Sequence, residues 1–135
     1  MSEQDNRQIV KDFYSQILLG NVEEVLTRFL APDIVWENPL PEPIPFGGTF
    51  HGRDGVRRYL EMIFAHVEIK EFPITEHLVQ GDTVVVLGSE ASLVKTTGRS
   101  YRMDWVHVLR IANGRIRQLR EYNDTAAMAA AFSRH

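Results

Sequence analysis

Four side chains able to move a proton or polarise a bound molecule fall within segments that the sequence predicts to be strands: Asn38, Glu90, His107 and Glu121. Alternate residues of a strand point to opposite faces, so a polar residue among apolar neighbours of the same parity points inward. Carboxyl and imidazole groups held in a cleft are the usual participants in acid–base chemistry. We therefore predict a proton-transfer site with Glu121 or Glu90 as acid or base and Asn38 and His107 as polarising donors.

Asn38 ends the short apolar segment Ile-Val-Trp-Glu-Asn-Pro, at residues 34–39. Asparagine has poor strand propensity, and a buried amide needs hydrogen-bond partners. It is either a satisfied structural amide or a group that reaches into a pocket. The following segment, Pro39 to Pro45, holds four prolines and no glycine. Such a stiff segment cannot continue a strand ladder, which predicts a rim or flap.

His107 lies on the more apolar face of its predicted strand. A period of two places Met103, Trp105, His107, Leu109 and Ile111 on one side. If this side is the interior, burial lowers the pKa of the imidazole unless a carboxylate stands near. Two interpretations stay open, a pocket residue or a core or interface histidine bonded to a backbone carbonyl.

Glu121 alternates with Leu119 and so shares its face, where burial would raise the pKa of the carboxyl. The alternative is a solvated edge on which Glu121 pairs with Arg120 or Arg117. A bulge in the strand would bring Tyr122 or Asp124 to the same place, although Asp124 is also a typical cap for a C-terminal helix.

The bulk composition limits the classes of partner. A net charge of −3 and a pI near 5.9 disfavour nucleic acid and anionic membranes. Cysteine is absent, so disulfides and thiol chemistry are excluded. No apolar run approaches the ~18 residues of a spanning helix, and we expect no leader peptide and a cytoplasmic address. His51, His66 and His77 lack metal-binding spacing, and we expect neither a metal nor a cofactor.

Helices come first and strands follow. Apolar residues at helical spacing predict helices at about 5–19, from Asn21 to about Leu30, and from Asp54 to about Phe64. After Val67 the period becomes two, and turns at 80–82, 97–98 and 113–114 separate four strands. This order predicts one α+β domain over 1–135, with the three N-terminal helices on the concave face of a curved antiparallel sheet.

The run Thr83 to Val94 is apolar on both parities through Val84, Val85, Val86 and Leu87. Such a strand is covered on both faces, one by helices and the other by a second subunit. We therefore expect a homodimer formed through the sheet.

The order of helices, Trp-Glu-Asn-Pro, Phe-His-Gly-Arg-Asp-Gly and a final Gly-Arg-Ile…Arg-Glu-Tyr-Asn-Asp resembles the SnoaL-like superfamily over nearly the whole chain. That superfamily shares the nuclear-transport-factor-2-like cone fold with ketosteroid isomerases, polyketide cyclases and limonene-epoxide hydrolases. The resemblance implies an apolar pocket inside the cone for a small oxygenated molecule, with Trp36 in its wall.

The family's catalytic residues transfer only in part. The general base of ketosteroid isomerases corresponds to Asn38, its oxyanion-hole tyrosine to Phe13 or Tyr14, and its protonated acid to a position near His107. Limonene-epoxide hydrolases resemble the chain at Trp36 and Asn38, and their catalytic acid corresponds to Glu121. The arginine and aspartate that complete the site of limonene-epoxide hydrolases, two residues apart, correspond to Gly88 and Glu90. The arginine is therefore missing from this chain.

We expect further pocket walls from the inward faces of the strands and of the third helix. They are Tyr59, Met103, Trp105 and Leu119. The sequence thus predicts an isomerase, cyclase or epoxide hydrolase that works by acid–base proton transfer. Two alternatives remain, a ligand-binding or assembly domain without turnover and a transport or scaffold domain.

Overall fold

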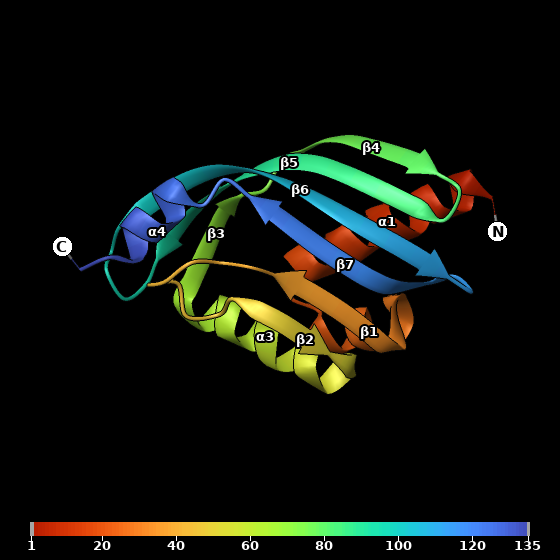
Figure 1. The fold of residues 1–135 in the computed structure, drawn as a ribbon, viewed down its shortest axis with the longest axis horizontal. Helices are drawn as coiled ribbons and strands as arrows, with labels where there is room; N and C mark the ends of the chain where they lie inside the picture. The colour runs from red at the N-terminus through yellow and green to blue at the C-terminus, as the bar shows by residue number, and fades with distance from the viewer. Residues whose placement is uncertain (1, 135) are drawn as a thin grey trace.

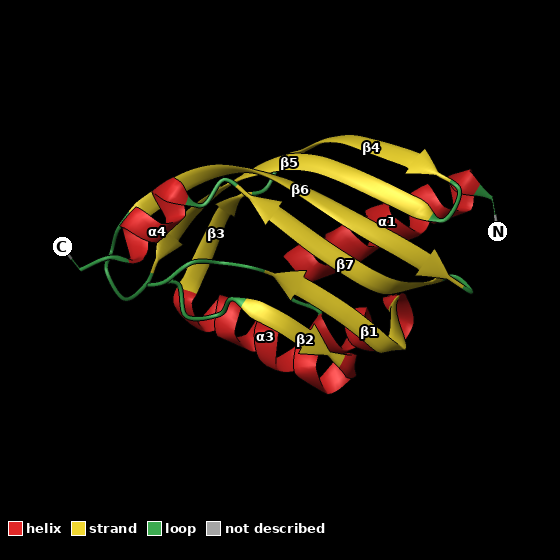
Figure 2. Cartoon of the chain, in the orientation of Figure 1, coloured by secondary structure: helices red, strands yellow, loops and turns green. Residues whose placement is uncertain are grey.

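The computed structural model of the chain describes residues 2–134. Four helices and a π-helical turn accompany one curved sheet (Figures 1 and 2). The helical segments are α1 (Glu3–Leu18), α2 (Val22–Glu24), the π-helical turn η1 (Val25–Phe29), α3 (Gly52–His66) and α4 (Ala126–Phe132). The strands are β1 (Leu30–Asn38), β2 (Gly48–His51), β3 (Val67–Glu71), β4 (Ile74–Gln80), β5 (Thr83–Val94), β6 (Ser100–Ala112) and β7 (Arg115–Asn123).

Helix α1 begins with a capping box between Ser2 and Asp5. The Asp5 backbone N–H donates to Ser2 Oγ, and the Ser2 N–H donates to the Asp5 carboxylate, each over 3.1 Å. The helix buries Val10, Phe13 and Tyr14 on one face. It ends before Gly20, whose φ of 77° suits a residue without a Cβ. The predicted first helix is confirmed to within two residues.

The sheet runs in the order β2-β1-β7-β6-β5-β3, and β4 pairs with the other end of β5. Most neighbours are antiparallel, as the sequence predicts, but β1 and β7 are parallel. The long strands β5 and β6 curve around α1 and α3, which lie on the concave side (Figure 1). The predicted α+β cone is therefore confirmed, with one parallel pair that the turn pattern did not reveal.

Three local expectations need correction. The second predicted helix is a short α-helical turn that continues as η1, where apolar Val25, Leu26 and Phe29 are buried. The strand expected before residue 80 is two strands, β3 and β4, interrupted at Phe72 and Pro73. The proline-rich segment is not only a rim, because Ile44 and Phe46 within and after it are buried in the core.

Helix starts also differ from expectation. Helix α3 begins at Gly52, two residues before the Asp54 that the sequence suggested as its cap. Asp124 does not cap α4 either, since Thr125 is the cap residue and no side chain bonds to the first turn. None of the helices within residues 2–134 combines the length and apolar composition that a bilayer crossing requires.

Candidate active site

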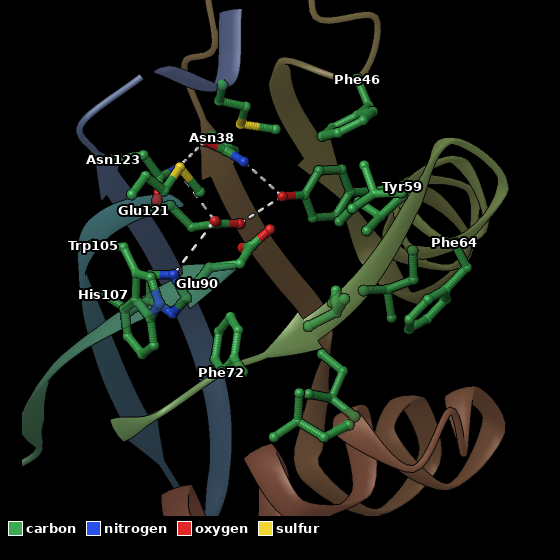
Figure 3. A pocket seen from close by; sticks show the side chains of 18 of the residues that line it. Asn38, Phe46, Tyr59, Phe64, Phe72, Glu90, Trp105, His107, Glu121 and Asn123 are labelled. Atoms are coloured by element: carbon green, nitrogen blue, oxygen red, sulfur yellow. Dashed lines mark hydrogen bonds and ion pairs between the residues drawn. The ribbon is translucent and has the colours of Figure 1, made fainter. Parts of the chain in front are cut away.

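A cavity of about 80 Å³ lies between the concave face of the sheet and helices α1 and α3 (Figure 3). This is several times the ~10–15 Å³ that one water molecule needs. Its walls are mostly apolar and include eight aromatic residues: Tyr14, Trp36, Phe46, Tyr59, Phe64, Phe72, Tyr101 and Trp105. Five further polar side chains reach it: Asn38, Glu90, His107, Glu121 and Asn123. An apolar cavity with a few convergent polar groups is the usual form of a small-molecule site.

Glu121 is the centre of the polar network. Its Oε2 accepts hydrogen bonds from Trp36 Nε1 at 2.7 Å and from the Tyr59 hydroxyl at 2.5 Å. Its Oε1 has two longer contacts, to His107 Nε2 at 3.3 Å and to Asn123 Nδ2 at 3.4 Å. Oε1 is therefore the less firmly bound oxygen.

The pKa of Glu121 is lowered, which corrects the expectation of a raised value. Burial alone would raise it, but nearby His107 and the hydrogen bonds from His107, Tyr59 and Trp36 outweigh burial. Glu121 points inward as predicted, and the solvated-edge alternative is wrong, because Glu121 is only 8% exposed. The carboxylate is thus an ionised group at neutral pH.

His107 stands directly opposite Glu121 on neighbouring strands β6 and β7. Its Nδ1 lies 2.6 Å from the Tyr14 hydroxyl. A ring proton on Nε2 would point to Glu121 and leave Nδ1 to accept from the Tyr14 hydroxyl, an arrangement that satisfies both contacts. His107 is therefore a cavity residue within a side-chain chain from Tyr14 to Glu121, and the alternative of a bond to a backbone carbonyl is not observed.

Asn38 orients its neighbours on the opposite side of Glu121. Its Nδ2 donates to the Tyr59 hydroxyl at 2.7 Å, and its Oδ1 accepts from Asn123 Nδ2 at 3.0 Å. Burial and the charge of Glu121 hold the pKa of Tyr59 well above its usual value. The phenol stays protonated and donates to Glu121, while Asn38 holds it in place.

Glu90 is a second carboxyl that faces the same cavity, from β5 (Figure 3). Its Oε2 accepts from the Tyr101 hydroxyl at 2.6 Å and from Ser92 Oγ at 2.7 Å. Both of these hydrogen bonds go to Oε2, and within residues 2–134 no hydrogen bond to Oε1 is observed. Burial raises the pKa of Glu90, and the charge of Glu121 adds to this effect. The surroundings of Glu90 thus shift its pKa upward, whereas those of Glu121 shift its pKa downward.

An aromatic stack forms the wall beside His107. Trp105 lies 4.1 Å from the His107 ring on one side and 4.7 Å from Phe72 on the other, with ring planes 26° and 25° apart. The edge of the indole covers Gly88: a Cβ there would come within 2.5 Å of Trp105 Cζ2 and 2.6 Å of the Pro73 carbonyl oxygen. Gly88 leaves the room that Trp105 occupies, so an arginine at this position has no space.

Gly88→Ala should therefore push Trp105 out of the stack. We expect a loss of about 1–3 kcal/mol in unfolding free energy, the usual cost of overpacking, together with a changed near-UV circular dichroism spectrum. Urea denaturation measures the first effect. Ser89→Ala, on the other face of the same strand, is the matched control. Equal midpoints and spectra for the Gly88 variant and the wild type would contradict the prediction.

Most of the predicted walls line the cavity: Tyr14, Trp36, Tyr59, Met103 and Trp105. Two predicted walls do not. Phe13 precedes Tyr14 by one residue, about 100° round the helix, and packs in the core against Phe29 and Trp36. Leu119 is fully buried in the same core, two residues below Glu121. Of the two helix-one candidates, it is Tyr14 that reaches the site.

Several cavity residues were not predicted. Tyr101 lies two residues before Met103, and Asn123 lies two residues after Glu121, so each points to the same face as that neighbour. Continuing the alternation of inward residues along each strand would have predicted both. Phe46 and Phe72 lie in connecting segments and gave no periodic indication. Tyr122 is 50% exposed on the outer face, and Asp124 is also exposed, so neither replaces Glu121. No cluster of His, Asp and Glu among the described residues could hold a metal ion.

Comparison with known proteins agrees with this architecture. A sequence profile of the SnoaL-like domain matches residues 10–119. An NTF2-like protein from Burkholderia xenovorans has 34% identity and a TM-score of 0.88, with 98% of this chain and 99% of that chain covered. An NTF2-like protein of unknown function from Burkholderia pseudomallei has 32% identity and a TM-score of 0.85 over the same shares.

A candidate SnoaL-like polyketide cyclase from Mesorhizobium loti is a more distant neighbour. It has 23% identity and a TM-score of 0.71, with 86% of this chain and 97% of that chain covered. At this identity the likeness shows the fold alone. No curated protein matches the chain. The matched profile, which spans most of the chain, and the cone with its lined cavity together show that the chain belongs to the SnoaL-like family.

Proposed function

We propose that the protein is an enzyme that transfers protons on a small, apolar, oxygenated substrate. The observation that carries this proposal is a pair of carboxyl groups in one apolar cavity whose pKa values move in opposite directions. When the surroundings push two titratable groups apart in this way, one serves as base and the other as acid. Glu121 is the base and Glu90 is the acid.

Isomerisation or aldol-type cyclisation uses both groups. Glu121 Oε1, held only by two long contacts, removes a proton from the carbon beside a carbonyl, while protonated Glu90 donates a proton to the carbonyl oxygen. The Tyr14–His107 chain and Trp36, Tyr59 and Asn123 keep the Glu121 carboxylate oriented. These contacts make His107 and Asn38 positioning residues.

Epoxide hydrolysis would use the same pair, with Glu121 taking a proton from water and Glu90 donating one to the epoxide oxygen. It is the less favoured reaction, because the family's linking arginine corresponds to Gly88, where Trp105 fills the space. The described cavity lining contains no lysine or arginine that could link the two carboxyl groups.

The alternative function is ligand binding without turnover. One observation favours it: the donors of Tyr14, Trp36, Tyr59 and Tyr101 are each taken by an internal acceptor. None of these four donors is then free for a substrate oxygen. The two functions differ in whether product forms.

Turnover of a mixed panel of β,γ-unsaturated ketones, polyketide-like β-ketones and terpene epoxides, with product detection by mass, tests the proposal. We expect conversion by the wild type and a loss of at least ~100-fold in Glu121→Gln, the range typical of a lost general acid or base. Glu61→Gln, at an exposed position on α3, is the control. Binding of panel members without conversion would support the alternative function.

We also propose that the outer face of the sheet joins two copies of the chain. Half-buried Val85, Leu87, Val106 and Val108 form its centre, and Leu78 and Tyr122 are 53% and 50% exposed beside them. Both signs of charge border this stripe, so opposite charges can meet when two identical faces pair. The bordering charges are Glu76, Arg102, Asp104 and Arg110.

Val108→Asp should therefore convert a wild-type dimer into monomers, because it places a charge at the centre of the apolar stripe. Sedimentation velocity at micromolar concentration measures the mass of each protein. Glu61→Gln should remain dimeric. A monodisperse wild-type monomer would contradict the proposed dimer.

A further inference from the structure

The cavity is poor in positive charge. Its described lining includes two carboxyl groups, Glu90 and Glu121, but no lysine or arginine. The single group able to become cationic, His107, is already engaged by Glu121 on one side and Tyr14 on the other. Bringing a further negative charge into this enclosed space would be costly, because charges buried without an opposite partner are strongly disfavoured.

Glu90 is the carboxyl whose partners leave it incomplete. Tyr101 and Ser92 both donate to its Oε2, so within residues 2–134 its Oε1 has no donor, and the side chain lines the cavity. Buried carboxylates in proteins are normally paired with a cation or fully hydrogen-bonded. Here the protein itself supplies no cation, and a bound molecule is the remaining source of one.

Aromatic rings gather on the same side. Phe72 and Trp105 are stacked 4.7 Å apart, and Tyr101 bonds to Glu90 directly. In the β5–β6 ladder Trp105 faces Gly88, so it is the diagonal neighbour of Glu90. Stacking against His107 and Phe72 occupies the faces of the Trp105 ring, so these rings form an apolar wall beside Glu90, and the charge preference comes from the carboxyl group.

The C-terminal ends of two helices add negative potential near the cavity. Leu18 and Phe64, in the last turns of α1 and α3, both line the cavity, and the C-terminal end of a helix carries a partial negative charge. Lys95 Nζ already donates to the Phe64 carbonyl at 2.6 Å, and Lys70 pairs with Glu68. These two lysines border an adjoining surface groove and are not part of the cavity lining.

We propose that this cavity selects ligands by charge: it binds an organic ammonium group against Glu90 and the Phe72–Trp105 wall more tightly than a neutral molecule of the same shape, and it rejects carboxylates. This inference goes beyond the proposed function, because a Glu90 that pairs with an ammonium group is ionised and is not the proton donor in that complex. It concerns binding and does not require turnover.

Three small aromatic probes that differ in charge test the inference by calorimetry at pH 7.5: benzylammonium, benzyl alcohol and benzoate. In the wild type we expect benzylammonium to bind at least ~10-fold more tightly than benzyl alcohol, and benzoate to bind most weakly. In Glu90→Gln the preference for the cation should fall to below ~3-fold, while the affinity for benzyl alcohol stays close to that of the wild type. The retained affinity for benzyl alcohol shows that the variant cavity is folded.

Three results would overturn the inference: benzoate or benzyl alcohol binding as tightly as benzylammonium, the cation preference persisting in Glu90→Gln, or no benzylammonium binding at ~10 mM. Glu61→Gln should bind all three probes as the wild type does. Failure of the turnover panel together with a Glu90-dependent cation preference would reject catalysis on neutral substrates but leave charge selection standing. Turnover of panel members without a Glu90-dependent cation preference would reject charge selection alone.

Discussion

Replacing Glu121 with glutamine is expected to lower the free energy of unfolding by about 3 kcal/mol at pH 7. The carboxylate accepts bonds from Trp36, Tyr59, His107 and Asn123. A glutamine keeps one acceptor oxygen but turns an NH₂ group toward donors. At least one buried donor then loses its partner, and the attraction to His107 is lost. Urea denaturation at pH 7 measures the difference from the wild type.

The pH dependence of this difference identifies its cause. The folded-state pKa of Glu121 lies below its ordinary value of 4.5. Below pH 4.5 the unfolded chain therefore binds more protons than the folded chain, so the stabilisation is fully present above that pH and is lost as pH falls through the folded pKa. The difference in unfolding free energy between the wild type and Glu121→Gln should therefore become smaller as the pH falls below 4.5. Equal stability at pH 7 would contradict the network, and Glu61→Gln should change stability by less than about 0.5 kcal/mol.

Glu90→Gln is expected to have opposite effects on catalysis and stability. Turnover should fall by at least ~100-fold, because the amide cannot donate a proton to substrate. The folded protein should become more stable above pH 4.5, because glutamine avoids a buried charge while its oxygen still accepts from Tyr101 and Ser92. Turnover on the ketone panel and urea denaturation at pH 5 and pH 8 measure the two effects.

The direction of this second effect follows from the raised pKa of Glu90. Between the ordinary value of 4.5 and the folded-state value, the folded chain binds more protons than the unfolded chain, so wild-type stability falls as pH rises. The advantage of Glu90→Gln should therefore be larger at pH 8 than at pH 5. A variant that is less stable at pH 8, or that keeps full turnover, would show that Glu90 is a structural carboxylate.

Much of the architecture was determined by local patterns. Apolar residues three and four apart placed α1 and α3, and the change of period after Val67 placed the strands β5 and β6. The same parity put His107 and Trp105 on the inner face. These predictions depend only on neighbours in sequence, because strand and helix periods decide which face a side chain occupies.

Other features of the fold depend on partners distant in sequence. The sequence around Leu30 and Arg115 does not predict that β1 and β7 pair in parallel. This pairing brings Trp36 beside Leu119 and places Asn38 close to Asn123. The inward position of Phe46 and Phe72 likewise comes from the packing of connecting segments onto the core.

The sequence by itself determined that a histidine and a carboxylate on the last two long strands could meet in the interior of a cone. The tertiary structure decided that they do. A simple two-residue hairpin at Asn113-Gly114 continues the pairing of Ile111 with Ile116, which would set His107 opposite Arg120. A bulge beyond Ile111 shifts the register by one, so Glu121 faces His107 instead. The lowered pKa of Glu121 has the same origin, because its donors come from β1, α3, β6 and β7, and only the folded chain assembles them.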